Sequence, residues 1–369
     1  MLMRPRHRWS AQGYPMNKHI SKAMHGILAL TAAAIVAVAP AAAAEKKDFK
    51  VAWSIYVGWM PWGYAADSGI VKKWADKYGI NIEVKQFNDY VESINQYTAG
   101  AFDAVTVTNM DALSIPAAGG VDTTAVIVGD FSNGNDAVIM KSKDKLADIK
   151  GQNVNLVEFS VSHYLLARAL ESVKLEEKDL KVVNTSDADM AAAYKTQDVT
   201  AVVTWKPIVS TILESPDAKK VFDSSQIPGE IIDLMVAHTA VVKDNPKFAQ
   251  ALAGIWYDTM AALAKDPAAK ETMAKASGTD VAGFDEQLAT TKLFSAPADA
   301  VAFTTSADLK TTTERVSKFL FEKALLGKDA KTAGAVGVEF PDKTVFGEKD
   351  NIKFRYDASF MEAAANGKL

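Results

Sequence analysis

Short apolar segments alternate with longer segments of helical periodicity through most of this chain, from about residue 49 to residue 325. Each apolar segment has the length of a buried strand, and the segments between them carry the spacing of amphipathic helices. This alternation predicts an α/β fold with mainly parallel sheets flanked by helices. The expected strands are 49–53, 82–87, 104–108, 124–128, 137–140, 153–157, 181–184, 201–204 and 234–242. The expected helices are 63–78, 89–99, 111–118, 162–173, 188–196, 206–214, 247–265, 268–276, 298–303 and 306–325.

Two stretches of the chain, 99–108 and 195–204, are similar to each other. In both, the end of a helix leads into a strand that stops at a threonine, Thr108 or Thr204, before a new helix begins. Ligands of open α/β sheets bind at the carboxyl ends of the strands. The pair therefore predicts two similar lobes whose strand ends face one cleft.

The composition is that of a folded globular protein. Of the 369 residues 49% are apolar and 23% are charged, which is too apolar for a disordered chain, and the length suits two domains. There is no cysteine. Disulfides, thiolate metal sites, cysteine nucleophiles and an N-terminal lipid anchor on cysteine are thereby excluded.

Residues 1–44 have the pattern of a secretory signal peptide. Basic residues come first, an apolar run follows over 26–39, and small residues end the segment at Ala44. The apolar run is too short to span a bilayer of about 30 Å as a helix. We expect cleavage after Ala44 and a periplasmic mature protein. Both Met1 and Met16 fit as the start of this signal.

The charge of the mature chain is acidic and unevenly placed. The leader holds five basic residues and no acid, which leaves 36 basic against 45 acidic residues, a formal charge of −9. Such a chain is not expected to bind nucleic acid, because phosphate neutralisation needs clustered lysine and arginine. Residues 86–140 contain no lysine or arginine but seven acids, several of them just after expected strand ends.

Motifs of catalysis and of cofactor binding are missing from the sequence. It has no HExxH, P-loop, GxSxG or GxGxxG pattern, and only His163 and His238 follow the leader. The turn at Asp130–Asp136 lacks the spacing of a calcium loop. We therefore expect no enzyme activity, no cofactor and no metal.

Several spaced motifs resemble a known family. They are the aromatic loop 53–62 (WSIYVGWMPW), the segment 99–112 with its Thr-Asn-Met-Asp ending, the turn 132–137, and the block 146–151. In this order they resemble the periplasmic substrate-binding proteins of ABC importers, in the nitrate, sulfonate, taurine and thiamine-precursor branch. Within that branch the aromatic loop and the Thr-Asn-Met-Asp segment are most similar to binding proteins encoded beside urea carboxylase.

The resemblance implies a type II binding-protein fold with two lobes joined by a two-strand hinge. It places a first part of lobe 1 at 45–140, lobe 2 at 141–241 and the rest of lobe 1 at 242–369, with crossings near 137–141 and 235–242. It also implies a monomer that delivers a small molecule to an ABC permease in the inner membrane, with its cytoplasmic ATPase.

Acids and aromatic residues are the expected chemistry of the cleft. Glu158 follows the first strand of the second unit, where an anionic ligand would otherwise dock on the next helix N-terminus. The mature chain has only three arginines. Tryptophan faces attract compact cations. The candidate ligand-binding residues are Trp53, Tyr56, Trp59, Asp89, Asn109, Asp111, Asp130, Glu158 and Trp205.

Each candidate acid except Glu158 also has a structural interpretation. Asp89 and Asp111 suit the first turns of helices, and Asp130 can order the turn that follows it.

These residues favour a small nitrogen-rich ligand, either guanidinium, a guanidine compound, or urea. A plane of N–H donors can be chelated by two carboxylates, whereas urea does not need two acids. The alternative is a receptor for an anion such as a sulfonate, taurine or nitrate, or for a thiamine precursor. A second alternative is an enzyme like the thiamine-pyrimidine synthases, but their cysteine-rich motif and active-site histidine have no match in this sequence. A third alternative is a sensor domain, which would be fused to signalling segments.

Overall fold

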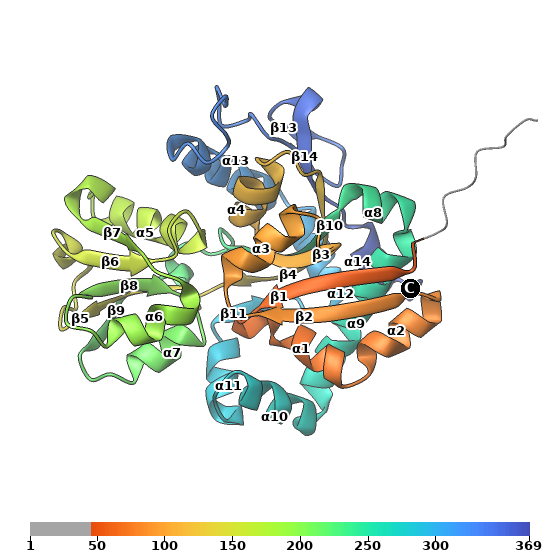
Figure 1. The fold of residues 1–369 in the computed structure, drawn as a ribbon, viewed down its shortest axis with the longest axis horizontal. Helices are drawn as coiled ribbons and strands as arrows, with labels where there is room; N and C mark the ends of the chain where they lie inside the picture. The colour runs from red at the N-terminus through yellow and green to blue at the C-terminus, as the bar shows by residue number, and fades with distance from the viewer. Residues whose placement is uncertain (1–45) are drawn as a thin grey trace, which may run out of the picture. The chain divides into compact units, whose positions relative to one another are not determined.

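The computed structural model describes residues 46–369, so the predicted signal peptide over 1–44 lies outside the described residues. Two mixed β-sheets, each with helices against its faces, make up the described chain (Figure 1). The predicted α/β fold with two helix-flanked sheets is thus confirmed.

The larger sheet has nine strands in the order β13-β12-β14-β4-β10-β3-β1-β2, with β11 also paired to β4. Its strands are β1 (Asp48–Ser54), β2 (Asn81–Phe87), β3 (Ala104–Thr108), β4 (Thr123–Ser132), β10 (Ile232–His238), β11 (Thr291–Leu293), β12 (Gly337–Glu339), β13 (Val345–Phe346) and β14 (Ile352–Tyr356). Strand β10 runs antiparallel to both of its neighbours, β3 and β4, whereas β1 pairs in parallel with β2 and β3.

The smaller sheet has five strands in the order β7-β6-β8-β5-β9. They are β5 (Ala137–Lys141), β6 (Asn153–Leu156), β7 (Lys181–Asn184), β8 (Ala201–Thr204) and β9 (Ala218–Asp223). Strands β6, β7 and β8 are parallel, and β5 is antiparallel to β8 and β9. The parallel pairing that the sequence predicts therefore holds for β1, β2, β3, β6, β7 and β8 among themselves, whereas β5, β10, β11 and β13 pair antiparallel with their neighbours.

Fourteen α-helices flank the sheets within residues 46–369. They are α1 (Met60–Asp67), α2 (Ile70–Tyr78), α3 (Tyr90–Thr98), α4 (Asn109–Ala112), α5 (Val161–Ser172), α6 (Asp187–Tyr194), α7 (Ile208–Leu213), α8 (Thr239–Asp244), α9 (Pro246–Lys265), α10 (Pro267–Ala276), α11 (Val281–Leu288), α12 (Pro297–Thr304), α13 (Ala307–Glu322) and α14 (Ser359–Ala365). Helices α5, α6 and α7 contact the smaller sheet, and α1, α2 and α14 pack on α9 beside the larger one.

The chain passes between the sheets twice, over residues 133–136 and 224–231. We call residues 46–132 with 232–369 the large lobe and residues 137–223 the small lobe. The segments 137–141 and 235–242, where the crossings were expected, instead form β5 and the end of β10 with the start of α8. The described lobe limits therefore come several residues before the expected boundaries at 140/141 and 241/242.

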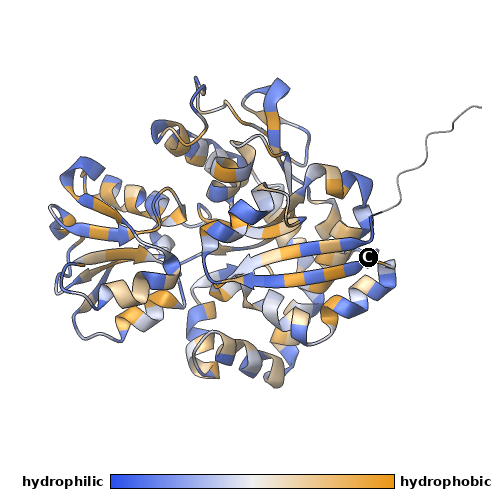
Figure 2. Ribbon diagram, in the orientation of Figure 1, coloured by the Kyte–Doolittle hydropathy of each residue, from blue (hydrophilic) through white to orange (hydrophobic). Residues whose placement is uncertain are grey.

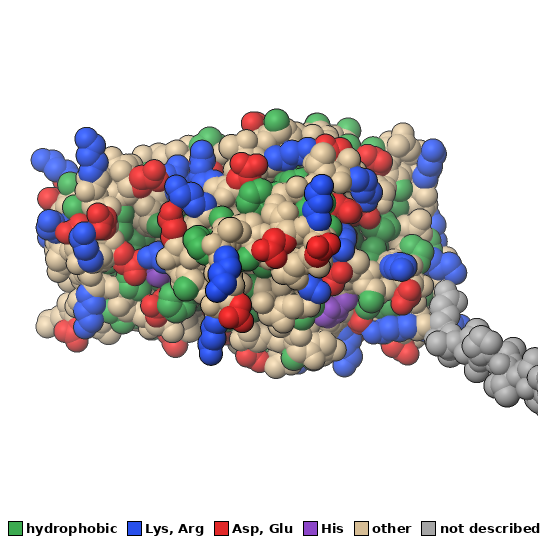
Figure 3. Space-filling view, turned by 90° about the horizontal axis from the view of Figure 1, so that it is seen from above, with side chains coloured by type: hydrophobic (Ala, Val, Ile, Leu, Met, Phe, Trp, Pro, Cys, Tyr) green, Lys and Arg blue, Asp and Glu red, His purple; other side chains and the backbone are tan. Residues whose placement is uncertain are grey.

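Both lobes have apolar interiors. Strands β3, β4, β5 and β8 are buried along most or all of their length, and Figure 2 shows the inner strands as largely hydrophobic. On the face drawn in Figure 3, basic and acidic side chains are interspersed. Within 46–369, no helix is both long and apolar enough to cross a membrane.

Candidate functional site

A small cavity lies where the two lobes meet the crossing segments. Its volume is about 10 Å³, which is room for about one water molecule. Its lining residues are Tyr56, Trp59, Tyr90, Thr108, Asp136, Val161, Trp205, Ile231 and Asp233. Tyr56, Tyr90, Thr108 and Asp233 come from the large lobe and Val161 and Trp205 from the small lobe, so the cavity is an interlobe site.

Strand ends and helix starts bring these side chains together. Thr108 ends β3 and caps α4, accepting a hydrogen bond from the Asp111 amide. Tyr90 begins α3, whose N-cap Asp89 accepts from the Glu92 amide. Val161 begins α5 and Trp205 follows β8 directly. The site therefore follows the carboxyl ends of β3 and β8, the two tandem strands noted in the sequence.

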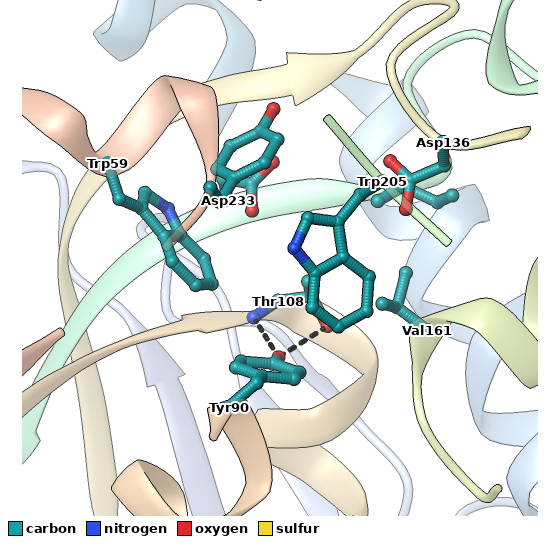
Figure 4. Close-up of a pocket in the computed structure, with 9 residues that line it drawn as sticks. Trp59, Tyr90, Thr108, Asp136, Val161, Trp205 and Asp233 are labelled. Atoms are coloured by element: carbon teal, nitrogen blue, oxygen red, sulfur yellow. Dashed lines mark hydrogen bonds between the residues drawn. The ribbon is translucent and has the colours of Figure 1, made fainter. Parts of the chain in front are cut away.

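Four aromatic rings form a chain around the cavity. Tyr56 contacts Trp59 edge-on with ring centroids 5.1 Å apart, Trp59 lies 5.6 Å from Tyr90, and Tyr90 lies 5.5 Å from Trp205. In Figure 4 the indoles of Trp59 and Trp205 stand on opposite sides of the space, with Tyr90 across the bottom of the view. Such a cage offers π faces to a compact cation.

Carboxylates close the other side of the cavity. Asp233 and Asp136 lie across the top of the view in Figure 4. Asp130 is the direct cross-strand partner of Asp233, and its Oδ1 accepts a hydrogen bond of 2.9 Å from the Tyr56 hydroxyl. Its Oδ2 is buried without a hydrogen-bond partner. No lysine, arginine or histidine is among the cavity's lining residues.

Burial raises the pKa values of these carboxyl groups. It raises the pKa of Asp130 to about 7, against hydrogen bonds from Asp233 and Tyr56 that lower it. Burial, with the negative charge of Asp130, also raises the pKa of Asp233 well above its ordinary value. For Asp136, burial raises the pKa to about 7, with a hydrogen bond from Ser132 opposing the rise. The site is thus a cluster of acids in which the anionic form is disfavoured by desolvation.

The N-terminus of α5 is already occupied by a protein carboxylate. Asp111 Oδ2 accepts hydrogen bonds from the Val161 amide at 3.2 Å, from the Tyr90 hydroxyl at 2.8 Å and from the Thr108 hydroxyl at 2.9 Å. Its Oδ1 has no partner. Burial raises the pKa of Asp111 to about 6. Backbone N–H groups at a helix start attract anions, and here Asp111 is that anion.

The three arginines of residues 46–369 are engaged away from the cavity. Arg168 and Arg315 both bind Glu230, and Arg355 pairs with Asp122. Glu230 also accepts from the Tyr164 hydroxyl at 2.6 Å. This cluster joins α5 of the small lobe to α13 of the large lobe through the second crossing.

Asn135 in the first crossing links the walls of the site. Its amide nitrogen donates to Thr291 Oγ1 at 2.7 Å, and its oxygen accepts from the Lys206 amide at 2.9 Å. The Ser132 and Ser224 hydroxyls, 2.6 Å apart, connect the two crossings behind it. The polar contacts between the crossings therefore adjoin the cavity directly.

The structure brings together some of the predicted site residues and not others. Tyr56, Trp59 and Trp205 line the cavity, and Asp111 and Asp130 lie one contact behind it. Trp53 is buried against Gly63, where an added Cβ would stand 2.6 Å from its indole. It does not line the cavity because the Gly63 position of α1 accepts its ring instead.

Three further candidates have structural partners. Asp89 caps α3 and accepts from the Ser186 hydroxyl at 2.9 Å. Asn109 donates to the Glu230 carbonyl and accepts from the Ile232 amide. Glu158 is half-buried outside the cavity, and its amide donates to the Asn184 side chain. The carboxylate expected at the α5 N-terminus is present, but Asp111 supplies it.

Sequence reasoning missed six lining residues: Tyr90, Thr108, Asp136, Val161, Ile231 and Asp233. Asp136 belongs to the base-free stretch of acids, and its place near the crossing was the available signal. Asp233 lies inside an apolar strand (IIDLMVA) rather than after one. An acid within a buried strand is itself unusual and was the signal to use.

Comparisons with known proteins agree with this fold. A family model described as the NMT1-like family matches residues 42–278. A protein of Brucella abortus (strain 2308) named as a binding protein is 24% identical over 176 residues, 47% of this chain and 54% of that protein. The taurine-binding periplasmic protein of Escherichia coli (strain K12) is 23% identical over 131 residues, 35% of this chain and 40% of that protein. The chain thus spans about half the length or less of these curated relatives.

Among solved structures, the chain is similar to the alkanesulfonate-binding protein of Xanthomonas axonopodis pv. citri bound to MOPS. The identity is 18% and the TM-score 0.63, with 78% of this chain and 96% of that chain covered. This similarity shows the fold.

Proposed function

The chain belongs to the NMT1-like family, and we propose that it is the solute receptor of an ABC importer. It binds a small nitrogen-rich solute between its lobes and delivers it to a permease of the inner membrane that works with a cytoplasmic ATPase. It acts in the periplasm as a monomer, without turnover. The likeness to binding proteins in sequence and in fold supports this proposal.

The observation that carries the ligand class is the set of buried carboxyl groups at the cavity. Asp130, Asp136 and Asp233 are buried, and no basic side chain lines the cavity with them. Burying a carboxylate away from water is costly unless it is paired or neutralised. A ligand that brings positive charge and N–H donors supplies what these oxygens lack.

Guanidinium fits this description better than urea. Its planar N–H donors match carboxylate oxygens in the paired geometry of an arginine–carboxylate contact. The cage of Trp59, Tyr90 and Trp205 adds π faces for a flat cation. Urea shares the shape but brings an additional acceptor and no charge.

An anionic ligand is the second candidate, because relatives of this chain are named for taurine and alkanesulfonate. Three features of the cleft oppose it here. Asp111 already occupies the α5 N-terminus, the arginines are bound elsewhere, and the lining acids would repel a sulfonate. A cationic ligand therefore remains our proposal for this chain.

A thermal-unfolding panel on the protein from residue 45 onward tests the proposal. Ligands that bind only the native state raise its stability, by about 2.7 kcal/mol at a hundredfold excess over Kd. The ligands are guanidinium chloride, urea, taurine, sodium nitrate and tetramethylammonium chloride, with sodium chloride as the ionic-strength control. Guanidinium, kept below denaturing concentration, should raise the midpoint most. Tetramethylammonium, a cation without N–H donors, should not raise it. A midpoint raised by taurine or nitrate alone contradicts the cationic ligand and supports the anion receptor.

A further inference from the structure

Asp130 and Asp233 stand directly opposite each other on adjacent antiparallel strands, β4 and β10. Side chains at such positions lie on the same face of the sheet, and like charges placed there destabilise it. Both residues are buried, Asp130 with no exposed surface and Asp233 with 3%. Gly58 packs closely against Asp130, because a Cβ added at Gly58 would stand 2.8 Å from Asp130 Oδ2.

No positive group faces this pair within the described residues around it. The ionisable groups that face it are Tyr56, from the turn before the 3-10 helix at Val57–Trp59, and Asp136 from the first crossing. Strand β3 presents Thr108 opposite Asp233, and β11 pairs Leu293 with Asp130. The neighbouring Lys292 is exposed.

The other described neighbours of the pair do not place a charge beside it. Helix α9 contributes Trp256, which lines a second small cavity with Asp233. Lys206 approaches from the small lobe, but its Nζ lies 3.4 Å from the Glu286 carbonyl oxygen.

We propose that Asp130 and Asp233 form a charge-selecting pair that keeps one shared proton in the empty cleft and releases it to solvent when a cationic ligand enters. This inference rests on the proposed function and names the chemistry by which that site distinguishes a cation from a neutral solute of the same shape. Asp233 is thereby a specificity-determining residue.

The protonation of the pair supports this exchange. Burial raises the pKa of Asp130 to about 7, and burial together with the charge of Asp130 raises the pKa of Asp233 well above its ordinary value. Two interacting carboxyls lose their protons in separate steps, so near neutral pH the pair carries one negative charge. A cation stabilises the doubly ionised pair and displaces the proton. Neutral urea offers no charge to replace it.

Ligand affinity should then depend on pH in a defined way. Guanidinium stays charged throughout the range in which the carboxyls titrate, so a pH dependence reports the protein. Below about pH 7 the ligand competes with the proton, and Kd should rise about tenfold for each unit of pH lost. Once the pH is high enough to ionise both carboxyls, Kd should be level.

Calorimetry in buffers of different ionisation enthalpy counts the protons released on binding. We expect guanidinium to release at least one proton per site at pH 6 and fewer at pH 9. Asp233→Asn removes one of the two facing acids, so it should release fewer protons at pH 6 than the unchanged protein. Asp103→Asn, a buried acid that binds Lys46 before β3, is the matched control and should behave as the unchanged protein.

The outcomes separate the inference from the function on which it rests. Guanidinium binding without proton release at pH 6 overturns the pair and leaves the receptor standing. So does loss of proton release in Asp136→Asn but not in Asp233→Asn, because Asp136 then holds the exchanged proton. No guanidinium binding at either pH, with taurine or nitrate bound instead, overturns both.

Discussion

Asp233 illustrates how a single residue can be costly to the fold and useful to the site. It is the second residue of β10, among buried apolar residues Ile232, Leu234 and Met235. A strand without this acid would pack as well and would carry no charge facing Asp130. We interpret its presence as the requirement of a ligand rather than of the sheet.

The stability of the empty protein should reflect this conflict. Asp130 and Asp136 have pKa values raised to about 7, above the value of about 3.9 for an unfolded aspartate. Between those values the folded state binds more protons than the unfolded state, so stability falls as pH rises. We expect the thermal midpoint to fall from pH 5 to pH 8 without ligand.

The variant Asp233→Asn gives the control for this pH dependence. It should reduce the fall of the thermal midpoint between pH 5 and pH 8 and raise the midpoint at pH 8. A stability gain of about 1 kcal/mol corresponds to a rise of roughly 2–4 °C in a large domain. A midpoint that increases steadily from pH 5 to pH 8 in the unchanged protein would show that these acids are not held protonated. Calorimetric scans across the pH range decide between these results.

Trp205 offers a test of the aromatic cage. Its indole lies edge-to-face with Tyr90, and its Nε1 donates to the Ile55 carbonyl of the other lobe at 3.1 Å. A cation–π contact contributes about 0.5–2 kcal/mol, so Trp205→Leu should weaken guanidinium binding by roughly 2- to 30-fold. Trp74→Leu, in α2 and bonded to Asp258 outside the cavity, should lower stability but leave Kd unchanged. Equal affinities of Trp205→Leu and the unchanged protein in a calorimetric titration would remove Trp205 from the site.

At the scale of elements, periodicity located the inner strands well. Strands β3, β7 and β8 begin and end at the predicted residues, because each is a short apolar run bounded by turn residues. Strand β9 (AKKVFD) was not predicted, since paired lysines on an edge strand hide its alternation. Strand β10 ends at His238 rather than at residue 242. Its neighbour β4 begins at Thr123, so no partner strand remains and the β-branched residues that follow form α8.

The candidate site was predictable only in part, because periodicity locates strands but not the register between them. Residues that follow strands, such as Tyr56 and Trp205, could be placed from the pattern. The position of Asp233 opposite Asp130 could not, because it comes from the register of β4 and β10, strands about a hundred residues apart. The sequence places Glu158 just before α5, whereas the packing of α4 against the small lobe puts the Asp111 carboxylate at the α5 N-terminus.

The Glu230 cluster ties helices of both lobes to the second crossing. Its carboxylate is 5% exposed and accepts from Tyr164 and Arg168, with Arg315 completing the cluster. Removing one member of a buried ion pair costs about 3–5 kcal/mol. The partial exposure of both arginines makes about 2–3 kcal/mol the expected loss for Glu230→Ala in urea unfolding. Asp76→Ala, whose pair with Lys72 is exposed, should change the unfolding free energy by less than about 0.5 kcal/mol. If the two variants lose equal stability, the cluster is not a structural tie.

At the scale of the molecule, hydrogen bonds near the cavity join the two lobes. They run from the Val57 amide to the Lys206 carbonyl, from Trp205 Nε1 to the Ile55 carbonyl, from the Val161 amide to Asp111, from the Tyr90 amide to Asp187, and from the Ser186 hydroxyl to Asp89. Opening the cleft by hinge motion at the crossings would break them, while Asp130 and Asp233 would stay paired within the sheet of the large lobe.

Closure on the ligand is therefore the expected global response. Small-angle scattering should give a smaller radius of gyration with saturating guanidinium than without it. The variant Asp233→Asn, at the same guanidinium concentration, should stay closer to the empty value because it binds more weakly. An identical radius for the empty and the saturated protein would contradict closure by the two crossings.

The central claim is that carboxylates and aromatic rings at the interlobe cavity hold a small cation. A crystal structure of the protein from residue 45 onward, grown with guanidinium chloride, tests it most directly. We predict planar density between Trp59 and Trp205, with nitrogen atoms within hydrogen-bond distance of Asp233 and of Asp130 or Asp136. Density for an anion at the α5 N-terminus with the Asp111 side chain displaced, or guanidinium bound only outside the cavity, would contradict the claim.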